Sequence, residues 1–139
     1  MKEIRVEKKL PYPPETVWNY VATRDGLSQW LMPNTFEPKV GHEFTFQTDP
    51  APGFDGVVHC RVTKLEPPKH LIFTWVGGGL DSTVQFHLEP IPEGTRVTVQ
   101  HHGFKGRNLI PRMILGFGWK KLVRQKLPAA IVDDSITSA

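Results

Sequence analysis

The sequence predicts an α+β fold in which a curved antiparallel sheet wraps around a long C-terminal helix, with two short helices after the first strand. Three observations predict this fold. Apolar and polar residues alternate along much of residues 36–102, as in strands with one buried face. Residues 109–127 form an amphipathic stretch that is typical of a helix covering such a face. A helical segment that begins at a proline follows the first strand.

The size and composition of the chain indicate one globular domain. It has 139 residues, of which 39% are hydrophobic and 22% are charged, which is too apolar for a disordered chain. The single cysteine, Cys60, excludes an intramolecular disulfide, and no apolar run approaches the roughly 20 residues that span a bilayer. Without an export signal, the expected location is cytoplasmic. We expect a single domain over residues 1–132 and a frayed tail over residues 133–139.

The N-terminal part is expected to form one strand and two short helices. The strand covers residues 2–10, whose apolar side chains fall on one face. Pro14 then lies in the first turn of a helix over residues 15–22, where its missing amide hydrogen costs nothing. A second helix is expected over residues 25–30, with Asp25 as its N-cap.

The middle of the chain is expected to form an antiparallel meander. Its strands are expected over residues 42–48 and 56–65 and then around Leu71, Phe73 and Trp75, around Val84, Phe86 and Leu88, and around Val97, Val99 and His101. The turns between the last four strands predict the cross-strand pairs Cys60–Trp75, Val62–Phe73, Phe73–Val84, Val84–His101 and Phe86–Val99. All these pairs keep the apolar residues on one face, and a slip by one residue at any turn would destroy that agreement.

The inner face of this meander needs a cover. The amphipathic helix over residues 109–127 supplies it, with Pro111 near its start and Pro128 expected to end it. A long helix across the concave face of an antiparallel sheet is a helix-grip layout.

At this point the chain resembles a known family. The matching residues run in order from Val17-Trp18 and Leu27 to Trp30-Leu31, through Gly41-His42-Glu43-Phe44, Leu65-Glu66-Pro67-Pro68 and Leu71-Ile72-Phe73-Thr74-Trp75, to His101-His102-Gly103-Phe104 and Gly118-Trp119. Their order and spacing resemble the START-like (SRPBCC) superfamily, and within it the family named for the activator of heat-shock protein 90 ATPase.

The resemblance implies a fold and three kinds of function. It implies a helix-grip domain with a cavity between the sheet and the long helix. Members of the superfamily carry lipids, hormones or polyketides, and some catalyse cyclisation or hydrolysis. We therefore expect binding of a small hydrophobic ligand in that cavity, with a co-chaperone-like interaction module as the alternative. A cyclase or hydrolase that uses His101 is the third hypothesis. Enzyme activity is less expected than binding, and we assign no catalytic residue.

The candidate ligand-binding residues are those that the strand pattern, the helix pair and the covering helix turn inward. They are Trp18, Trp30, Phe44, Phe46, Val58, Cys60, Phe73, Trp75, Val84, Phe86, His101, Leu115 and Trp119. Two interpretations remain open for them: a filled core, or the wall of an apolar pocket. His101 is either a core histidine paired with a carbonyl or hydroxyl, or a polar handle for a ligand carbonyl or carboxylate. Cys60 is expected to behave as a small hydrophobe with a raised pKa rather than as a nucleophile.

The six histidines do not suggest a metal site. His59 and His87 lie on strands that a third strand separates, and the register places His102 opposite Thr83 rather than opposite His87. The sequence contains neither a helical pair of histidines four residues apart nor a cysteine pair. We therefore expect neither a metal nor a cofactor.

Positive charge is concentrated near the C-terminus. The net charge of the chain is +3, but residues 1–93 carry −3, whereas residues 94–132 carry +8 with no acidic residue. Lys120, Lys121 and Arg124 therefore form a candidate surface for an acidic protein partner. A solvated helix face, an anionic form of the apolar ligand and an anionic membrane surface are the other interpretations. Nucleic acid is not expected, since no aromatic interleaving or DNA-binding motif accompanies the charge.

Overall fold

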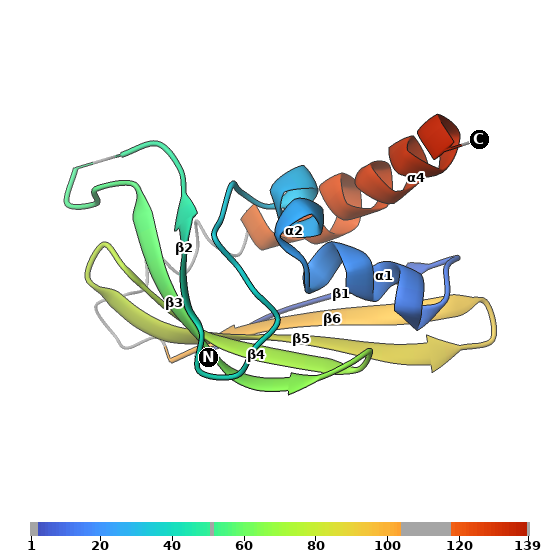
Figure 1. Cartoon of the computed structure of the whole chain (residues 1–139), viewed down its shortest axis with the longest axis horizontal. Coiled ribbons are helices and arrows are strands. Elements are labelled where there is room, and N and C mark those ends of the chain that lie inside the picture. Colours follow the sequence, from blue (N-terminus) through green and yellow to red (C-terminus); the bar gives the residue numbers. More distant parts are fainter. Residues whose placement is uncertain (1–2, 51, 104–117, 139) are drawn as a thin grey trace.

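The protein folds into one six-stranded antiparallel sheet with helices on one face (Figure 1). The computed structural model describes residues 3–50, 52–103 and 118–138, and the side chains of 133–138 are not described. The strands are β1 (Glu3–Leu10), β2 (Glu43–Gln47), β3 (Val57–Glu66), β4 (His70–Gly77), β5 (Leu80–Ile91) and β6 (Gly94–His102). Their order is β1-β6-β5-β4-β3-β2, so the meander of β2 to β6 is completed by β1 beside β6. The predicted α+β helix-grip class is confirmed.

The registers of the meander follow the alternation in the sequence. The predicted pairs Val62–Phe73, Phe73–Val84, Val84–His101 and Phe86–Val99 are all present. His102 also lies opposite Thr83, as predicted. The register of β3 with β4 shifts between Val62 and Lys64, an irregularity that simple alternation does not predict.

The two short helices are α1 (Pro14–Val21) and α2 (Arg24–Trp30). The predicted N-cap of α2, Asp25, is wrong. Thr23 is the N-cap, because its side-chain oxygen accepts a hydrogen bond of 3.0 Å from the amide of Gly26. Asp25 lies in the first turn instead, where a negative charge still favours the helix.

The C-terminal helix extends further than the sequence predicts. Residues 118–121 are helical, Leu122–Lys126 form a π-helical turn (η2), and α4 covers Leu127–Ser138. The prediction that Pro128 ends the helix is therefore wrong, and residues 133–138, expected to be a frayed tail, continue α4. A proline ring clashes with the carbonyl four residues earlier in a regular helix, and the wider turn directly before Pro128 provides room. The first half of the predicted helix, residues 109–117, lies outside the described residues.

The core lies between the inner face of the sheet and the helices. Figure 1 shows α1, α2 and α4 together on this one face. The helix side chains Val17, Leu27, Val123 and Leu127 are 0% exposed and pack against the buried residues of the strands. No helix within the described ranges is both long and apolar enough to cross a membrane.

Candidate functional site

A buried chain of hydrogen bonds joins the sheet to the C-terminal helix. The indole Nε1–H of Trp119 donates to Nδ1 of His101 over 3.0 Å. Nε2 of His101 lies 2.7 Å from Oγ of Ser82, and that hydroxyl donates to the backbone carbonyl of Trp75 over 2.9 Å. All four residues are buried, and His101 is 0% exposed. Strands β4, β5 and β6 are thus connected to the helix through polar groups that are shielded from water.

Both ends of this chain determine the direction of its hydrogen bonds. A backbone carbonyl only accepts, so Ser82 donates to Trp75 and its oxygen accepts from Nε2–H of His101. An indole N–H only donates, so Nδ1 of His101 carries the lone pair that Trp119 needs. His101 is therefore neutral, with its proton on Nε2. Burial, and then the charge of His102, lower the pKa of His101 to about 3, in agreement with a neutral ring.

Aromatic rings surround this polar chain. The ring centroid of Trp75 lies 5.3 Å from that of His101 and 5.8 Å from that of Trp119. Phe86 meets Trp119 edge-on at 6.1 Å, and Phe46 lies 5.6 Å from Trp75. We call these five residues together with Ser82 the inner cluster. Its rings provide a large apolar surface, and its polar atoms are concentrated at one point.

Most residues predicted to line a ligand site lie on this inner face. Those that are at most 6% exposed are Trp30, Phe44, Phe46, Val58, Cys60, Phe73, Trp75, Val84, Phe86, His101 and Trp119. Trp18 is only partly buried and packs against the outside of this group, and Leu115 lies outside the described residues. The structure therefore brings eleven of the thirteen predicted side chains into one packed core.

Ser82 is the member of the inner cluster that the sequence analysis did not assign. Its position gives a signal, since Ser82, Val84 and Phe86 alternate on the buried face of β5. A serine in such a row has to pair its hydroxyl with a nearby polar group when it is buried. Here that requirement is met by His101 and by the carbonyl of Trp75.

Neither reactive side chain on the inner face suits catalysis. A general base has to hold the proton that it takes up, whereas burial lowers the pKa of His101 to about 3 and so disfavours its protonated form. Burial raises the pKa of the Cys60 thiol, which keeps it protonated and unreactive. This agrees with the expectation that Cys60 is a small hydrophobe.

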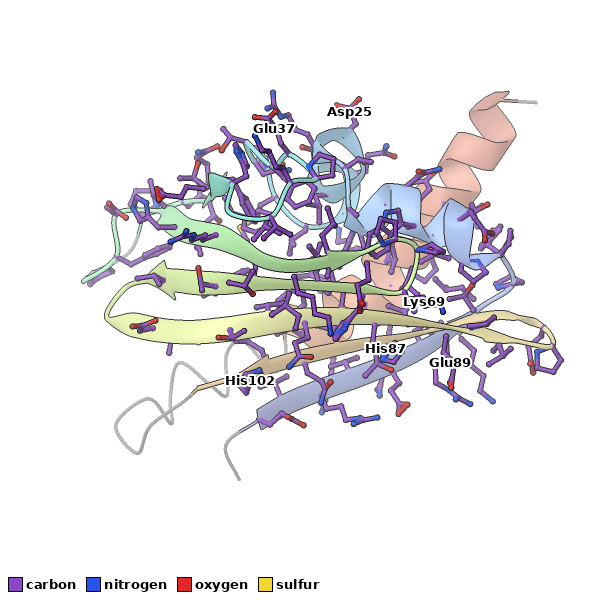
Figure 2. The ribbon with its side chains drawn as sticks, turned by 60° about the horizontal axis from the view of Figure 1, so that its bottom comes forward. Asp25, Glu37, Lys69, His87, Glu89 and His102 are labelled. Carbon is purple, nitrogen blue, oxygen red and sulfur yellow. The ribbon has the colours of Figure 1, made fainter. Side chains whose placement is uncertain are left out.

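A second group of histidines lies on the outer face of the sheet, where Figure 2 labels His87 and His102. His70 lies directly opposite His87, with ring centroids 5.4 Å apart. The Gln85 amide connects His70 to His102 through hydrogen bonds of 3.1 and 3.0 Å. The sequence comparison of His87 with His59 and His102 did not predict this pairing with His70. Within the described part of the chain, no three His, Cys, Asp or Glu side chains form a group that could hold a metal.

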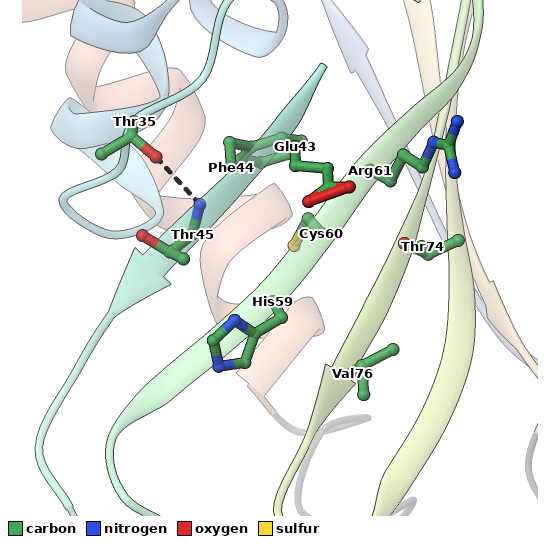
Figure 3. A pocket seen from close by; sticks show the side chains of 9 residues that line it. All are labelled: Thr35, Glu43, Phe44, Thr45, His59, Cys60, Arg61, Thr74 and Val76. Carbon is green, nitrogen blue, oxygen red and sulfur yellow. Dashed lines mark hydrogen bonds between the residues drawn. The ribbon is translucent and has the colours of Figure 1, made fainter. Parts of the chain in front are cut away.

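The outer face also contains an open hollow of about 400 Å³ (Figure 3). Its lining comes from Thr35 and from β2, β3 and β4: Thr35, Glu43, Phe44, Thr45, His59, Cys60, Arg61, Thr74 and Val76. The amide of Thr45 donates to the Thr35 hydroxyl over 3.0 Å at one end of it. Of the predicted ligand residues only Phe44 and Cys60 belong to this lining, and their side chains are buried. This outer hollow is thus separate from the inner cluster.

A match to a protein-family model identifies the family of this chain. The model of the Activator of Hsp90 ATPase homolog 1-like protein matches residues 11–131. The chain belongs to this family. The matched range includes every residue of the inner cluster and of the outer hollow. It also includes most of the described C-terminal helix.

Solved structures of similar proteins share the fold of this family member. Protein MLL2253 of Mesorhizobium loti is 30% identical, with a TM-score of 0.87 over 95% of this chain and 98% of that one. Protein BH1534 of Bacillus halodurans is 31% identical, with a TM-score of 0.80 over 94% and 97%. The Aha1 dimer of Colwellia psychrerythraea, at 20% identity, has a TM-score of 0.76 over 95% and 98% and shows the fold alone. A search of the curated proteins finds no match.

The three cations predicted to form a partner surface lie on the C-terminal helix. Lys120, Lys121 and Arg124 are exposed, and none of the ion pairs among the described residues involves them. Lys126 is exposed on the same helix. Of the other four cations in residues 94–132, Arg96 forms an ion pair with Glu89, whereas Lys105, Arg107 and Arg112 lie outside the described residues.

Proposed function

We propose that the protein binds a small hydrophobic ligand between the inner face of its sheet and its C-terminal helix. The observation that carries this proposal is the buried polar chain from Trp119 through His101 to Ser82, set among aromatic rings. Ligand sites are usually lined by apolar and aromatic side chains, with a few polar groups that fix the orientation of the ligand. The inner cluster has this composition, and the family resemblance to carriers of lipids and polyketides agrees with it.

Ligand entry requires a movement of the inner cluster. Trp75 is 6% exposed and Trp119 is 1% exposed, so their rings occupy the space that a ligand would take. The C-terminal helix supplies Trp119, and a shift of this helix would open the inner face while the six-stranded sheet stays intact. The apparent affinity is then the affinity of the open form multiplied by the fraction of molecules that are open.

A titration followed by NMR tests this proposal. Laurate and naphthalene are added separately to ¹⁵N-labelled protein, up to millimolar concentration. We expect the indole N–H signal of Trp119 and the ring signals of His101 to shift together for at least one compound, and the melting temperature to rise. Thr83→Ala, on the outer face of β5, is the matched control and should bind equally. Absence of binding, or shifts confined to His59 and Thr74 at the outer hollow, would contradict the proposal.

A second candidate function is docking of an acidic protein on the C-terminal helix. The observation in its favour is the set of exposed cations Lys120, Lys121 and Arg124, without an acidic neighbour in residues 94–132. Complementary charge accelerates association and makes it dependent on salt.

Charge reversal tests this second candidate. Lys120, Lys121 and Arg124 are each changed to Glu, and binding of a glutamate-rich peptide is measured at low and at physiological salt. We expect wild-type binding that weakens with salt and is lost in the triple variant. Reversal of the exposed Lys9, Lys39 and Lys69 gives the same change in net charge elsewhere and serves as the control. Equal losses in both triple variants would show that only net charge matters.

A further inference from the structure

We infer that the ligand of the inner cluster is an uncharged ring compound that carries a hydrogen-bond donor beside an acceptor, as a carboxamide does. It binds by replacing the hydrogen bond between Trp119 and His101. This inference rests on the proposed function and adds the chemical class of the ligand.

The fixed direction of the buried hydrogen-bond chain carries the inference. The Trp75 carbonyl and the Ser82 hydroxyl hold the proton of His101 on Nε2, so Nδ1 remains an acceptor. When Trp119 moves away, it exposes a donor on the helix, while His101 exposes an acceptor on β6. These two atoms are 3.0 Å apart in the closed protein. A ligand that enters between them has to satisfy both, because an unpaired buried polar group is costly.

A carboxamide meets both requirements with one group. Its carbonyl oxygen accepts from Nε1–H of Trp119, and its N–H donates to Nδ1 of His101. A ketone of the same shape pairs with Trp119 but offers no donor to Nδ1 of His101. At His101 the two ligands therefore differ by one buried hydrogen bond, the one from the amide N–H to Nδ1.

A carboxylate fits less well than either neutral group. It offers no donor to Nδ1 of His101, and its charge would have to be buried. The polar groups of the inner cluster, those of Ser82, His101 and Trp119, are neutral and bring no positive charge to an anion. His101 cannot supply the positive charge near neutral pH, because its burial opposes protonation.

The rings of the inner cluster favour a flat aromatic body. The ring of Trp119 packs against Trp75 at an interplanar angle of 56° and against Phe86 at 80°, so an aromatic ring that takes its place meets both side chains. Offset and edge-to-face contacts with these rings suit an aromatic ligand better than a flexible chain.

Three isosteric probes test the inference at pH 7.4: 2-naphthamide, 2-acetylnaphthalene and 2-naphthoate. Their dissociation constants are measured from the shifts of the Trp119 indole N–H and the His101 ring. We expect the amide to bind at least about tenfold more tightly than the ketone, which corresponds to one buried hydrogen bond. The naphthoate should bind most weakly.

The variant Ser82→Ala tests the role of the locked proton. Without the serine, Trp119 alone keeps the His101 proton on Nε2. Once Trp119 moves away, the proton can move to Nδ1, and a ligand then meets two donors. The advantage of the amide over the ketone should shrink at least about tenfold, while Thr83→Ala keeps the wild-type ranking. The ¹⁵N shifts of the His101 ring report the position of the proton independently of ligand binding, and they also show whether the variant is folded.

The outcomes separate this inference from the proposed function. If naphthoate binds at Trp119 as tightly as the amide, the inference is overturned, but ligand binding stands. If the amide and the ketone bind equally in the wild type, the inference is overturned in the same way. If neither these probes nor laurate nor naphthalene binds, the proposed function itself is lost.

Discussion

Histidines lie on both faces of the same sheet, and their surroundings differ. On the inner face, His101 is 0% exposed and both of its ring nitrogens are engaged, by Ser82 and by Trp119. On the outer face, His87 is exposed, and His70 and His102 are half-buried around the Gln85 amide. The inner histidine thus belongs to a fixed network, whereas water reaches the outer group.

For both His101 and His87, burial lowers the pKa more than the neighbouring charges do. Burial is the first cause of the lowered pKa of His101, and the charge of His102 adds to it. Burial followed by the charge of His70 also lowers the pKa of His87, which is partly opposed by Glu89. The shift is largest where the ring is completely enclosed. A histidine that is neutral and locked can orient a ligand but cannot supply charge to it.

The largest expected effect comes from removing the helix side of the inner network. Trp119→Ala should lower the free energy of unfolding by about 3–5 kcal/mol, because a buried indole is lost and His101 loses its donor. Urea denaturation measures this change. Val76→Ala, on the outer face of β4, is the control and should cost less than about 1 kcal/mol. A cost below about 1 kcal/mol for Trp119→Ala would mean that the inner face is not tightly packed.

The next effect concerns acid stability. The pKa of His101 is about 3 in the folded protein and 6.5 in the unfolded chain, so the unfolded chain takes up the proton first as pH falls. The contribution of the neutral His101 to the free energy of unfolding is therefore complete above pH 6.5 and is lost as the pH falls towards 3. From pH 7 to pH 5 this residue should account for a loss of about 2 kcal/mol.

Urea denaturation at several pH values checks this expectation. The variant His101→Gln should show a smaller loss of stability between pH 7 and pH 5 than the wild type. Thr83→Ala, on the outer face of β5, changes no titratable group and should keep the wild-type dependence. If His101→Gln and the wild type lose stability in parallel, His101 does not stay neutral in the fold.

The smallest effect is expected on the outer face. His87→Ala should change the free energy of unfolding by less than about 0.5 kcal/mol, because an exposed side chain leaves no cavity. Thermal or urea denaturation at pH 7 measures it. A cost of 2 kcal/mol or more would show that the outer histidines support the sheet as strongly as the inner cluster does.

The sheet was predictable because apolar and polar residues alternate with a period of two along its strands. Alternation together with proline and glycine turns placed Phe73 opposite Val84 and Phe86 opposite Val99 without knowledge of the rest of the chain. The shift between Val62 and Lys64 left no such mark, because one extra residue in a strand changes neither composition nor the turns.

The helix ends were less predictable, since they depend on local competition. Thr23 and Asp25 are both good N-caps two residues apart, and the amide of Gly26 decided between them. Pro128 normally signals the end of a helix, but a π-helical turn before it absorbs the clash. The spacing of apolar residues does not predict such a π-helical turn, so it does not predict that the helix continues past Pro128.

The candidate site was predictable as a set of residues but not as a network. Inward positions follow from alternation, and His101 was among them. Its partners required the three-dimensional fold, because Ser82 and Trp119 lie 19 and 18 residues away along the chain. Of this network, only the serine leaves a signal in the sequence, because a serine at a buried strand position predicts a buried hydrogen bond.

The pairing of β1 with β6 has a consequence during synthesis. Glu3 pairs with His102, so the first strand of the sheet to be made waits for a partner that is the last strand. At about 5–20 residues per second, this wait on the ribosome is roughly 5–20 s. The charged residues Arg5, Glu7 and Lys9 alternate with the apolar ones along β1 and point away from the core. Charged side chains on an unpaired strand disfavour its pairing with other chains during this time.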